Sequence, residues 1–324
     1  MELRIGTRGS QLALWQANTV AERLAATGAP PCRIVVIKTT GDQLQERPLS
    51  EVGGKRLFVK EIEDALLRNE VDLAVHSSKD MPAVLPDGLS IAGVLPREDP
   101  HDAVVLPIRA EGLGLRAGEA LSTQLSALVD FLGPTPSIGT GSVRRVAQLL
   151  NVFPRARFAD VRGNVDTRLR KLEEGQYDAL VLAAAGLRRL GFGERISMTL
   201  PSDVCVPAPG QGIVAIETRD DDEATRAIVA RITDRSAGAA LDAERAVVEA
   251  LGGGCQTPIG ALAVPLDRET IRLVAAVATL DGSQIIRATV TGPRREAAVL
   301  DARAGRDLIA QGADVILAKA QTRA

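Results

Sequence analysis

The sequence predicts an α/β protein with two similar, doubly wound lobes and a smaller C-terminal α/β domain. Strand and helix patterns alternate over the first hundred residues, and the same alternation begins again at Ser137. Residues 5–10 (IGTRGS) resemble residues 138–142 (IGTGS), and residues 71–75 (VDLAV) resemble residues 177–181 (YDALV). Because both the pattern and the sequence repeat, we expect two lobes that face each other across a cleft.

In each lobe, apolar periodicity with Gly and Pro punctuation predicts the individual elements. For the first lobe we expect strands at 3–5, 33–37 and 71–76 and helices at 11–26 and 57–68. For the second lobe we expect a strand from 137, a helix from 142, a strand at 157–161, a helix at 165–174, a strand at 178–183 and a short helix at 187–190. The run PAPGQG at 207–212 precedes an apolar strand at 213–217, which we expect to return the chain to the first lobe.

The patterns in the remaining sequence predict an insertion in the second lobe and a third domain. Residues 111–136 are rich in Gly, Leu and Ser, and we expect an insertion on the second lobe with one helix at 122–131. After the acidic residues 220–223, the patterns predict an antiparallel three-stranded sheet between helices, with a helix at 239–251, strands at 259–264, 271–280 and 284–290, and a final helix from Arg295. The predicted domains are 1–101 together with 212–232, then 102–211, then 233–324.

Composition narrows the class of protein. A chain of 324 residues with 45% hydrophobic content is long enough for two or three domains. Its 39 basic and 41 acidic residues give a net charge of −2, which argues against a nucleic-acid partner, and 2% aromatic residues leave little for base stacking. An apolar run of signal-peptide or membrane-span length is absent, so we expect a cytoplasmic protein with no membrane partner. Three separated cysteines and two histidines predict no metal site.

Arginines gather at two equivalent strand-to-helix turns. Arg144 and Arg145 fall in the first turn of an expected helix, where the helix dipole disfavours cations. Arg162 and Arg168 flank the next such turn, and Arg8 follows the first strand of the chain. A lone arginine is usually a solvated or ion-paired surface residue. The cluster instead predicts a site for several carboxylates or phosphates.

Polar residues also follow the carboxyl ends of the expected strands, where open α/β sheets bind ligands. One site shared between the lobes would collect Arg8, Ser10, Lys79, Asp80, Thr140, Ser142 and Arg162. Within it, the Asp80 carboxylate beside Lys79 could stabilise a developing cation or move a proton, although Asp is also common in ordinary turns. We expect His76, in the same segment, to be structural.

Cys255 differs from the other two cysteines in its surroundings. It follows three glycines in LGGGCQTPIG (251–260), which places a thiol on a glycine loop between a helix and a strand. A covalent role and an inert, buried thiol are both compatible with this position. Cys32 and Cys205 are expected to be inert, and the three thiols fit a reducing compartment.

Together these motifs resemble the porphobilinogen deaminase (hydroxymethylbilane synthase) family. The resemblance runs from Arg4 to about Arg306 through an ordered set of motifs, namely GTRGSQLALWQ (6–16), VGGK (52–55), FVKE (58–61), HSSKD (76–80), RGNVDTR (162–168), AGLRRL (185–190), GQG (210–212) and GGC (253–255). It implies three domains, of which the first two are similar to type II periplasmic binding proteins. The third would carry a dipyrromethane cofactor on Cys255 through a thioether.

By this resemblance the chain is expected to be a transferase of tetrapyrrole (heme and chlorophyll) biosynthesis. It would condense four porphobilinogen molecules onto the dipyrromethane, release ammonia each time, and hydrolyse off hydroxymethylbilane. Each pyrrole carries an acetate and a propionate, so a growing chain needs a cationic cleft. The implied catalytic residue is Asp80, which would stabilise the positive charge formed as ammonia leaves. The implied cofactor contacts are Lys79, Asp80, Thr140, Ser142, Arg144, Arg145 and Arg162, and the implied substrate contacts are Arg8, Ser10, Ser77, Arg168, Arg189 and Gln211.

Three positions depart from the family pattern. Gly141 stands where many relatives have serine, Arg56 fills a position that is usually small, and the 111–136 region is longer than expected.

Two other functions are compatible with parts of the chain. A non-enzymatic two-lobed protein that binds or senses an anion would leave Cys255 without a use. A nucleotide-handling enzyme would lack both a P-loop and a Rossmann glycine motif at the first turn. We expect a monomer that acts on a small molecule.

Overall fold

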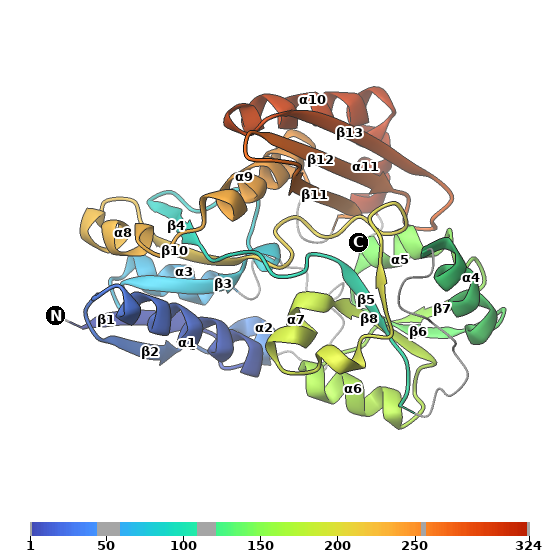
Figure 1. Cartoon of the computed structure of the whole chain (residues 1–324), viewed down its shortest axis with the longest axis horizontal. Helices are drawn as coiled ribbons and strands as arrows, with labels where there is room; N and C mark the ends of the chain where they lie inside the picture. Colours follow the sequence, from blue (N-terminus) through green and yellow to red (C-terminus); the bar gives the residue numbers. More distant parts are fainter. Residues whose placement is uncertain (1, 44–58, 109–120, 254–256, 323–324) are drawn as a thin grey trace.

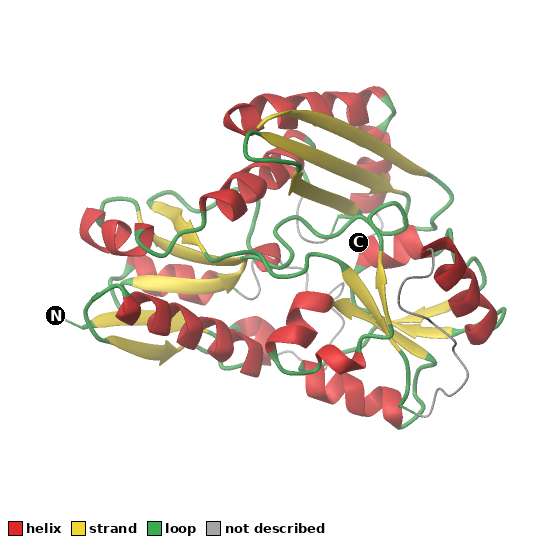
Figure 2. Cartoon of the chain, in the orientation of Figure 1, coloured by secondary structure: helices red, strands yellow, loops and turns green. Residues whose placement is uncertain are grey.

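The computed structural model describes residues 2–43, 59–108, 121–253 and 257–322. These residues form two five-stranded sheets and one three-stranded sheet, each covered by helices (Figures 1 and 2). The first two sheets belong to lobes that lie side by side in Figure 1, and the third unit lies over the junction between them. The predicted fold class is therefore confirmed, while the positions of the domain boundaries along the connecting segments remain predictions.

The first lobe has the strand order β2-β1-β3-β10-β4. Strands β2 and β3 run parallel to β1, whereas β10 runs antiparallel to both β3 and β4. Side chains of α1 pack on one face of this sheet and side chains of α3 on the other. The bounds are β1 Leu3–Thr7, α1 Gln11–Ala26, β2 Cys32–Val36, α2 Thr40–Gln43, α3 Lys60–Leu67, β3 Leu73–Ser77, β4 Leu89–Val94, β10 Val214–Arg219 and α8 Glu223–Ala230.

The second lobe repeats this arrangement in the order β7-β6-β8-β5-β9. Strands β7 and β8 run parallel to β6, and β5 runs antiparallel to both β8 and β9. The two sheets thus have the same order and directions, which confirms the expected pair of similar lobes. The bounds are β5 Asp102–Val105, α4 Leu121–Leu132, β6 Ser137–Gly139, α5 Val143–Leu149, β7 Arg157–Ala159, α6 Val165–Glu173, β8 Ala179–Ala183, α7 Ala184–Arg189 and β9 Met198–Leu200.

Equivalent serines begin the first helix of the repeat in each lobe. The Ser10 hydroxyl accepts a hydrogen bond from the backbone N–H of Ala13 at the start of α1, at 3.3 Å. The Ser142 hydroxyl accepts one from the backbone N–H of Arg145 at the start of α5, at 3.4 Å. Each cap satisfies a helix N–H that has no partner within the helix. The internal sequence repeat therefore encodes the same strand, turn and capped helix twice.

The third unit is a small antiparallel sheet with helices on one side (Figure 2). Its order is β11-β12-β13, and α9, α10 and α11 build the main core with it. The opposite face packs on Val206, between the two lobes. The bounds are α9 Arg235–Ala250, β11 Ile259–Pro265, β12 Thr270–Ala278, β13 Ile285–Pro293, α10 Ala297–Ala310 and α11 Ala313–Thr322. Within the described ranges, no helix has the length and apolarity that crossing a bilayer requires.

Several elements differ from the sequence-based expectations. The predicted helix at 11–26 has those bounds, but the predicted helix from 239 already begins at Arg235, because the Asp234 carboxylate caps it. The acidic stretch 220–223 contains Asp222, which caps the unpredicted helix α8. Strands β4, β5 and β9 and helix α11 were also not predicted, and the three strands are each only three to six residues long. Such short runs carry little periodicity.

Two connecting segments, 95–101 and 201–213, join the lobes and run beside each other (Figure 1). The backbone N–H of Glu98 donates to the Gly212 carbonyl at 3.0 Å, and Arg97 Nε donates to the Gln211 carbonyl at 2.9 Å. Gly212 has φ +87°, and a Cβ there would lie 2.3 Å from the Glu98 carbonyl oxygen. Only glycine therefore allows the two connections to approach this closely.

Replacing Gly212 with Ala should destabilise the protein more than replacing Gly28 with Ala. Both residues have positive φ, which costs an Ala about 1–2 kcal/mol, but a Cβ on Gly28 would meet no atom within 4 Å. We expect Gly212→Ala to lower the free energy of unfolding in urea by about 3 kcal/mol or more. Equal losses in the two variants would show that the contact with Glu98 adds no constraint.

Candidate functional site

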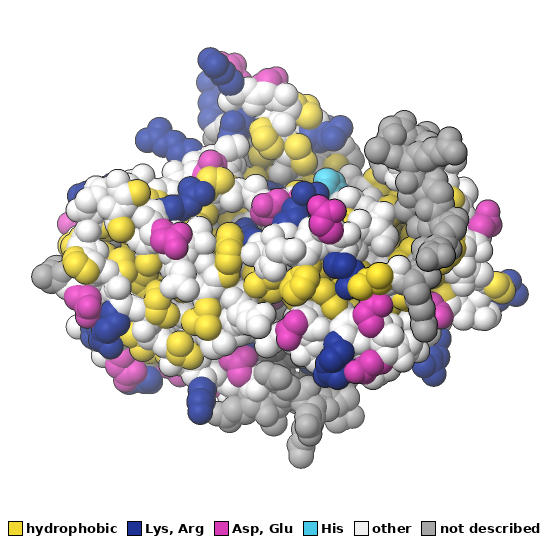
Figure 3. Space-filling model, turned by 60° about the horizontal axis from the view of Figure 1, so that its bottom comes forward, with side chains coloured by type: hydrophobic (Ala, Val, Ile, Leu, Met, Phe, Trp, Pro, Cys, Tyr) yellow, Lys and Arg dark blue, Asp and Glu magenta, His cyan; other side chains and the backbone are white. Residues whose placement is uncertain are grey.

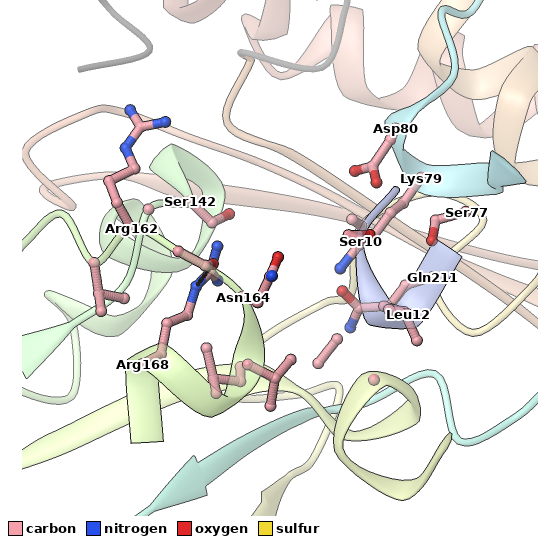
Figure 4. Close-up of a pocket in the computed structure, with 18 of the residues that line it drawn as sticks. Ser10, Leu12, Ser77, Lys79, Asp80, Ser142, Arg162, Asn164, Arg168 and Gln211 are labelled. Atoms are coloured by element: carbon pink, nitrogen blue, oxygen red, sulfur yellow. Dashed lines mark hydrogen bonds between the residues drawn. The ribbon is translucent and has the colours of Figure 1, made fainter. Parts of the chain in front are cut away.

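A cavity of about 360 Å³ lies between the two lobes. In Figure 4, Ser10, Leu12, Ser77, Lys79 and Asp80 from the first lobe face side chains of the second lobe across it. The opposite wall includes Ser142, Arg162, Asn164 and Arg168, and Gln211 comes from the second connecting segment. The cavity is therefore lined by both lobes and by one of the segments that join them.

Parallel strands place these side chains at the cavity. Strand β1 ends at Thr7, just before Arg8 and Ser10, and β3 ends at Ser77, just before a 3₁₀ turn at Ser78–Asp80. Strands β6 and β7 end in the same way before Ser142 and Arg162. Because the carboxyl ends of parallel strands meet at one edge of a sheet, each lobe presents its polar turns to the gap.

Asp102 is the central charge at the back of this cavity. It is the first residue of β5 and is fully buried. Its carboxylate lies 2.7 Å from Arg144 Nη1 and 2.8 Å from Arg145 Nε, and it accepts a hydrogen bond from Gln211 Nε2 at 2.9 Å. Burial alone would raise the pKa of Asp102, but the two guanidinium groups hold that pKa far below its ordinary value.

Asp102 supplies an anion for Arg144 and Arg145 from within the protein, while their expected contacts with a bound cofactor remain a prediction. Both arginines line the cavity, yet they are only 4% and 6% exposed. Backbone carbonyls accept further hydrogen bonds from the two guanidinium groups. Arg144 Nη1 donates to the oxygen of Val206 at 2.7 Å, and Arg145 Nη1 donates to that of Val181 at 3.0 Å. One carboxylate against two guanidinium groups still leaves an excess of positive charge.

Lys79 and Arg168 carry positive charge in the cavity without a carboxylate at ion-pair distance among the residues described. Arg168 donates from Nε to the Gly163 carbonyl at 2.9 Å. Burial lowers its pKa, and the neighbouring guanidinium groups of Arg145 and Arg162 lower it further. Burial likewise lowers the pKa of Lys79 to about 8, although the Asp80 carboxylate opposes the shift. Crowded, partly desolvated cations of this kind are ready to accept an anion.

The other cationic residues at the cavity have acidic partners. Arg8 pairs with Asp42, and Arg162 Nε lies 2.6 Å from the Asp160 carboxylate. On the face of the molecule shown in Figure 3, basic and acidic side chains are interspersed. Among the cations that line the cavity, only Lys79 and Arg168 thus lack an acidic partner in the described residues. The face in Figure 3 shows no broad basic surface of the kind that nucleic-acid binding requires.

Two predicted site residues lie outside the set that lines this cavity. Thr140 is buried, and its hydroxyl has no hydrogen-bond partner within the described ranges. Arg189 lies at the end of α7, next to Leu190, which does line the cavity. His76 is also buried in β3, where its ring nitrogen lies 3.1 Å from the Glu217 carboxylate, as a structural residue would.

Cys255 lies outside the described residues, but its neighbours in sequence adjoin the site. A second, smaller cavity of about 80 Å³ is lined by Thr257, Val248 and Ile259 of the third unit. The same cavity is lined by Lys79, Ser142 and Arg144, which also line the larger one. The part of the third unit that flanks Cys255 thus opens towards the cations between the lobes.

Sequence reasoning did not identify Asp102 or Cys205 as part of this site. The Cys205 thiol lies 3.3 Å from the Asp102 carboxylate, and burial raises its pKa to about 12, so it is an un-ionised group here. Asp102 opens a four-residue strand that was itself not predicted. The paired Arg144 and Arg145 were the only signal in the sequence that a buried acid was needed nearby.

Comparison with known proteins gives matches along nearly the whole chain. The family described as "Porphobilinogen deaminase, dipyromethane cofactor binding domain" matches residues 3–227, and "Porphobilinogen deaminase, C-terminal domain" matches residues 239–310. The chain is 44% identical to the porphobilinogen deaminase of Syntrophotalea carbinolica, over 98% of this chain and 95% of that protein. It is 43% identical to that of Pelotomaculum thermopropionicum, over 99% and 97%. Among solved structures, it is similar to a putative methionine-binding lipoprotein from Bacillus subtilis at 12% identity and a TM-score of 0.39, over 71% of this chain and 89% of that chain.

Replacing Asp102 with Asn should strongly destabilise the protein, because it leaves Arg144 and Arg145 buried together without a counter-charge. We expect the free energy of unfolding in urea at pH 7 to fall by about 3–5 kcal/mol. The low pKa of Asp102 stabilises the folded state above the ordinary aspartate pKa of about 3.9, and this stabilisation fades as the pH falls. The difference between wild type and variant should therefore narrow in acid.

Asp160→Asn is the matched control for this variant. It removes the acidic partner of Arg162 in a partly exposed pair, which should change the free energy of unfolding by no more than about 1 kcal/mol. If both variants lost the same small amount, Asp102 would not be the charge on which the buried arginines depend.

Proposed function

Since the chain belongs to the porphobilinogen deaminase family, we propose that it condenses four porphobilinogen molecules head-to-tail onto a covalently attached dipyrromethane. Each addition releases ammonia, and hydrolysis then frees hydroxymethylbilane for tetrapyrrole biosynthesis. The observation that carries the proposal is the interlobe cavity, in which Lys79 and Arg168 lack acidic partners among the described residues and Asp80 lies on the wall beside Lys79.

The charge of this cavity fits the dipyrromethane. Every pyrrole ring of porphobilinogen and of the cofactor carries an acetate and a propionate, so both are polyanions. Lys79 and Arg168 could each pair with one carboxylate, and Arg144 and Arg145 add the excess charge that Asp102 leaves. A charge-assisted hydrogen bond contributes about 1.5–3 kcal/mol, so a few such contacts would hold the bound group firmly. When bound, the dipyrromethane supplies the pyrrole carbon to which the first substrate is joined.

We assign the covalent attachment to Cys255. The second cavity supports this assignment, because Thr257, two residues further along the chain, lines it together with Lys79 and Ser142. A group attached to this part of the third unit could thus reach the cations between the lobes. The protein would need no separate binding step for the cofactor during turnover, because a thioether keeps the group in place.

Asp80 is the proposed catalytic residue. Its carboxylate lies on the wall of the cavity next to the Lys79 ammonium group, so positive and negative charge are presented side by side. Asp80 would accept a hydrogen bond from a pyrrole N–H and stabilise the positive charge that develops on the substrate as ammonia leaves. Lys79 would neutralise a substrate carboxylate close to it.

We also propose that the enzyme acts as a monomer in the cytoplasm. Residues of both lobes, of the second connecting segment and of the third unit line the two cavities, so a single chain supplies all of these walls. Cys32 and Cys205 are free thiols, which fits a reducing compartment. The expected partner is the small-molecule substrate porphobilinogen.

The intact mass of the purified protein tests the covalent attachment. We expect the mass to exceed the sequence mass by two linked pyrrole units, and we expect Cys255→Ser to remove this increment. Cys32→Ser is the matched control, because Cys32 is a free thiol that lines neither cavity, and its replacement should leave the increment in place. A fully active protein with the unmodified mass would contradict the proposal.

Replacing Asp80 with Asn tests the catalytic assignment separately from attachment. The variant keeps the size of the side chain but lacks the negative charge, so ammonia release from porphobilinogen should fall by at least about 100-fold. The covalent mass increment should remain. Turnover close to that of the wild type would remove Asp80 from the mechanism.

A further inference from the structure

Arg189 is a partly buried cation whose supports come from three separate parts of the fold. It is the last residue of α7 in the second lobe. Its Nη2 donates to the Gly212 carbonyl of the second connecting segment at 2.6 Å. Its guanidinium carbon lies 5.5 Å from the centre of the Trp15 ring, and Trp15 belongs to α1 of the first lobe. Arg189 is thus held between both lobes and the segment that joins them.

These supports leave Arg189 without a carboxylate at ion-pair distance in the described part of the chain. Burial lowers its pKa to about 10, and the nearest acidic influence, Glu98, offsets the effect only in part. The hydrogen bonds found for its guanidinium group involve Nη2 alone, so the donors on Nε and Nη1 have no partner among the described residues. The Arg189 guanidinium group is thus held in place through Nη2, while the edge formed by Nε and Nη1 makes no hydrogen bond among the described residues.

Arg189 also lies next to the interlobe cavity. Gly186 and Leu190 of the same chain segment line that cavity, and so does Leu12, one helical turn before Trp15. Trp15 itself does not line the cavity and is 37% exposed. Arg189 directly precedes the lining residue Leu190, whereas Trp15 is three residues from the lining residue Leu12, so we expect any effect of the indole ring on binding to pass through Arg189.

We propose that Trp15 is a positioning residue, whose indole face and the Gly212 carbonyl together hold Arg189 so that its free edge receives a carboxylate of porphobilinogen. An unrestrained arginine loses side-chain freedom when it binds, and a guanidinium group already stacked on an aromatic ring loses less. The ring also stabilises the cation that burial disfavours. The proposal rests on the proposed function, because it names the substrate that Arg189 receives.

Kinetics of ammonia release from porphobilinogen test this role. Trp15→Leu removes the aromatic face and should raise KM by about three- to tenfold while kcat stays within about twofold of wild type. Trp15→Phe keeps an aromatic face and should retain most of the wild-type KM. If KM is unchanged in Trp15→Leu, or if Phe restores nothing, Trp15 does not position the substrate-binding group.

A double-mutant cycle separates this role from simple packing of α1. Arg189→Gln should raise KM by itself, and adding Trp15→Leu to it should raise KM no further. An equal effect of Trp15→Leu with and without Arg189 would overturn the proposal. Arg188→Gln is the matched control, because Arg188 pairs with Asp99 at the surface, 3.3 Å away, and its loss should leave KM unchanged.

Trp15 also provides a direct readout of the contact, because it is the single tryptophan of the chain. Its fluorescence emission should differ between wild type and Arg189→Gln and should not change in Arg188→Gln. Emission that is the same in all three proteins would contradict the stacked arrangement. A wild type that releases no ammonia from porphobilinogen would instead contradict the proposed function, so the two failures are distinguishable.

Discussion

The ion pairs of Asp102 with Arg144 and Arg145 are the interaction on which the rest of the cavity depends. Two adjacent guanidinium groups at the start of a helix would repel each other and oppose the helix dipole. One fully buried carboxylate from β5 holds both, and Gln211 joins this carboxylate to the second connecting segment. The same contacts therefore fix the positive charge of the cavity and bind the second lobe to the segment between the lobes.

The pairing of one carboxylate with two guanidinium groups leaves the cavity positively charged, which suits a site for polyanions. A second acid beside Asp102 would have neutralised the arginines fully and removed the reason for an anionic ligand to bind. Lys79 and Arg168 add positive charge without a carboxylate at ion-pair distance among the described residues, and burial lowers the pKa of each. Asp80 and Asp160 are the acidic residues that line the described cavity, and Asp160 pairs with Arg162, so Asp80 is the carboxylate that we propose stabilises a cation on the bound polyanionic substrate.

Much of this architecture could be predicted from local sequence signals. The repeated IGTRGS and IGTGS segments predicted equivalent turns, and Ser10 and Ser142 cap equivalent helices there. The buried partner of the arginines could not be predicted in the same way. Asp102 lies 42 residues before Arg144 in the chain, in a short strand without periodicity, so only the antiparallel pairing of β5 with β8 brings it to the site. Likewise, Arg189 has a clear motif in the sequence, but its contact with Trp15 arises from the packing of one lobe against the other.

The central claim is that carboxylates of a covalently attached polyanion meet the uncompensated cations between the lobes. A crystal structure of the purified, cofactor-loaded protein tests it most directly. The account predicts continuous electron density from the sulfur of Cys255 to carboxylates beside Lys79 and Arg168, with Arg144 and Arg145 still paired with Asp102. Density for the attached group outside the interlobe cavity, with Lys79 and Arg168 facing only solvent, would contradict it.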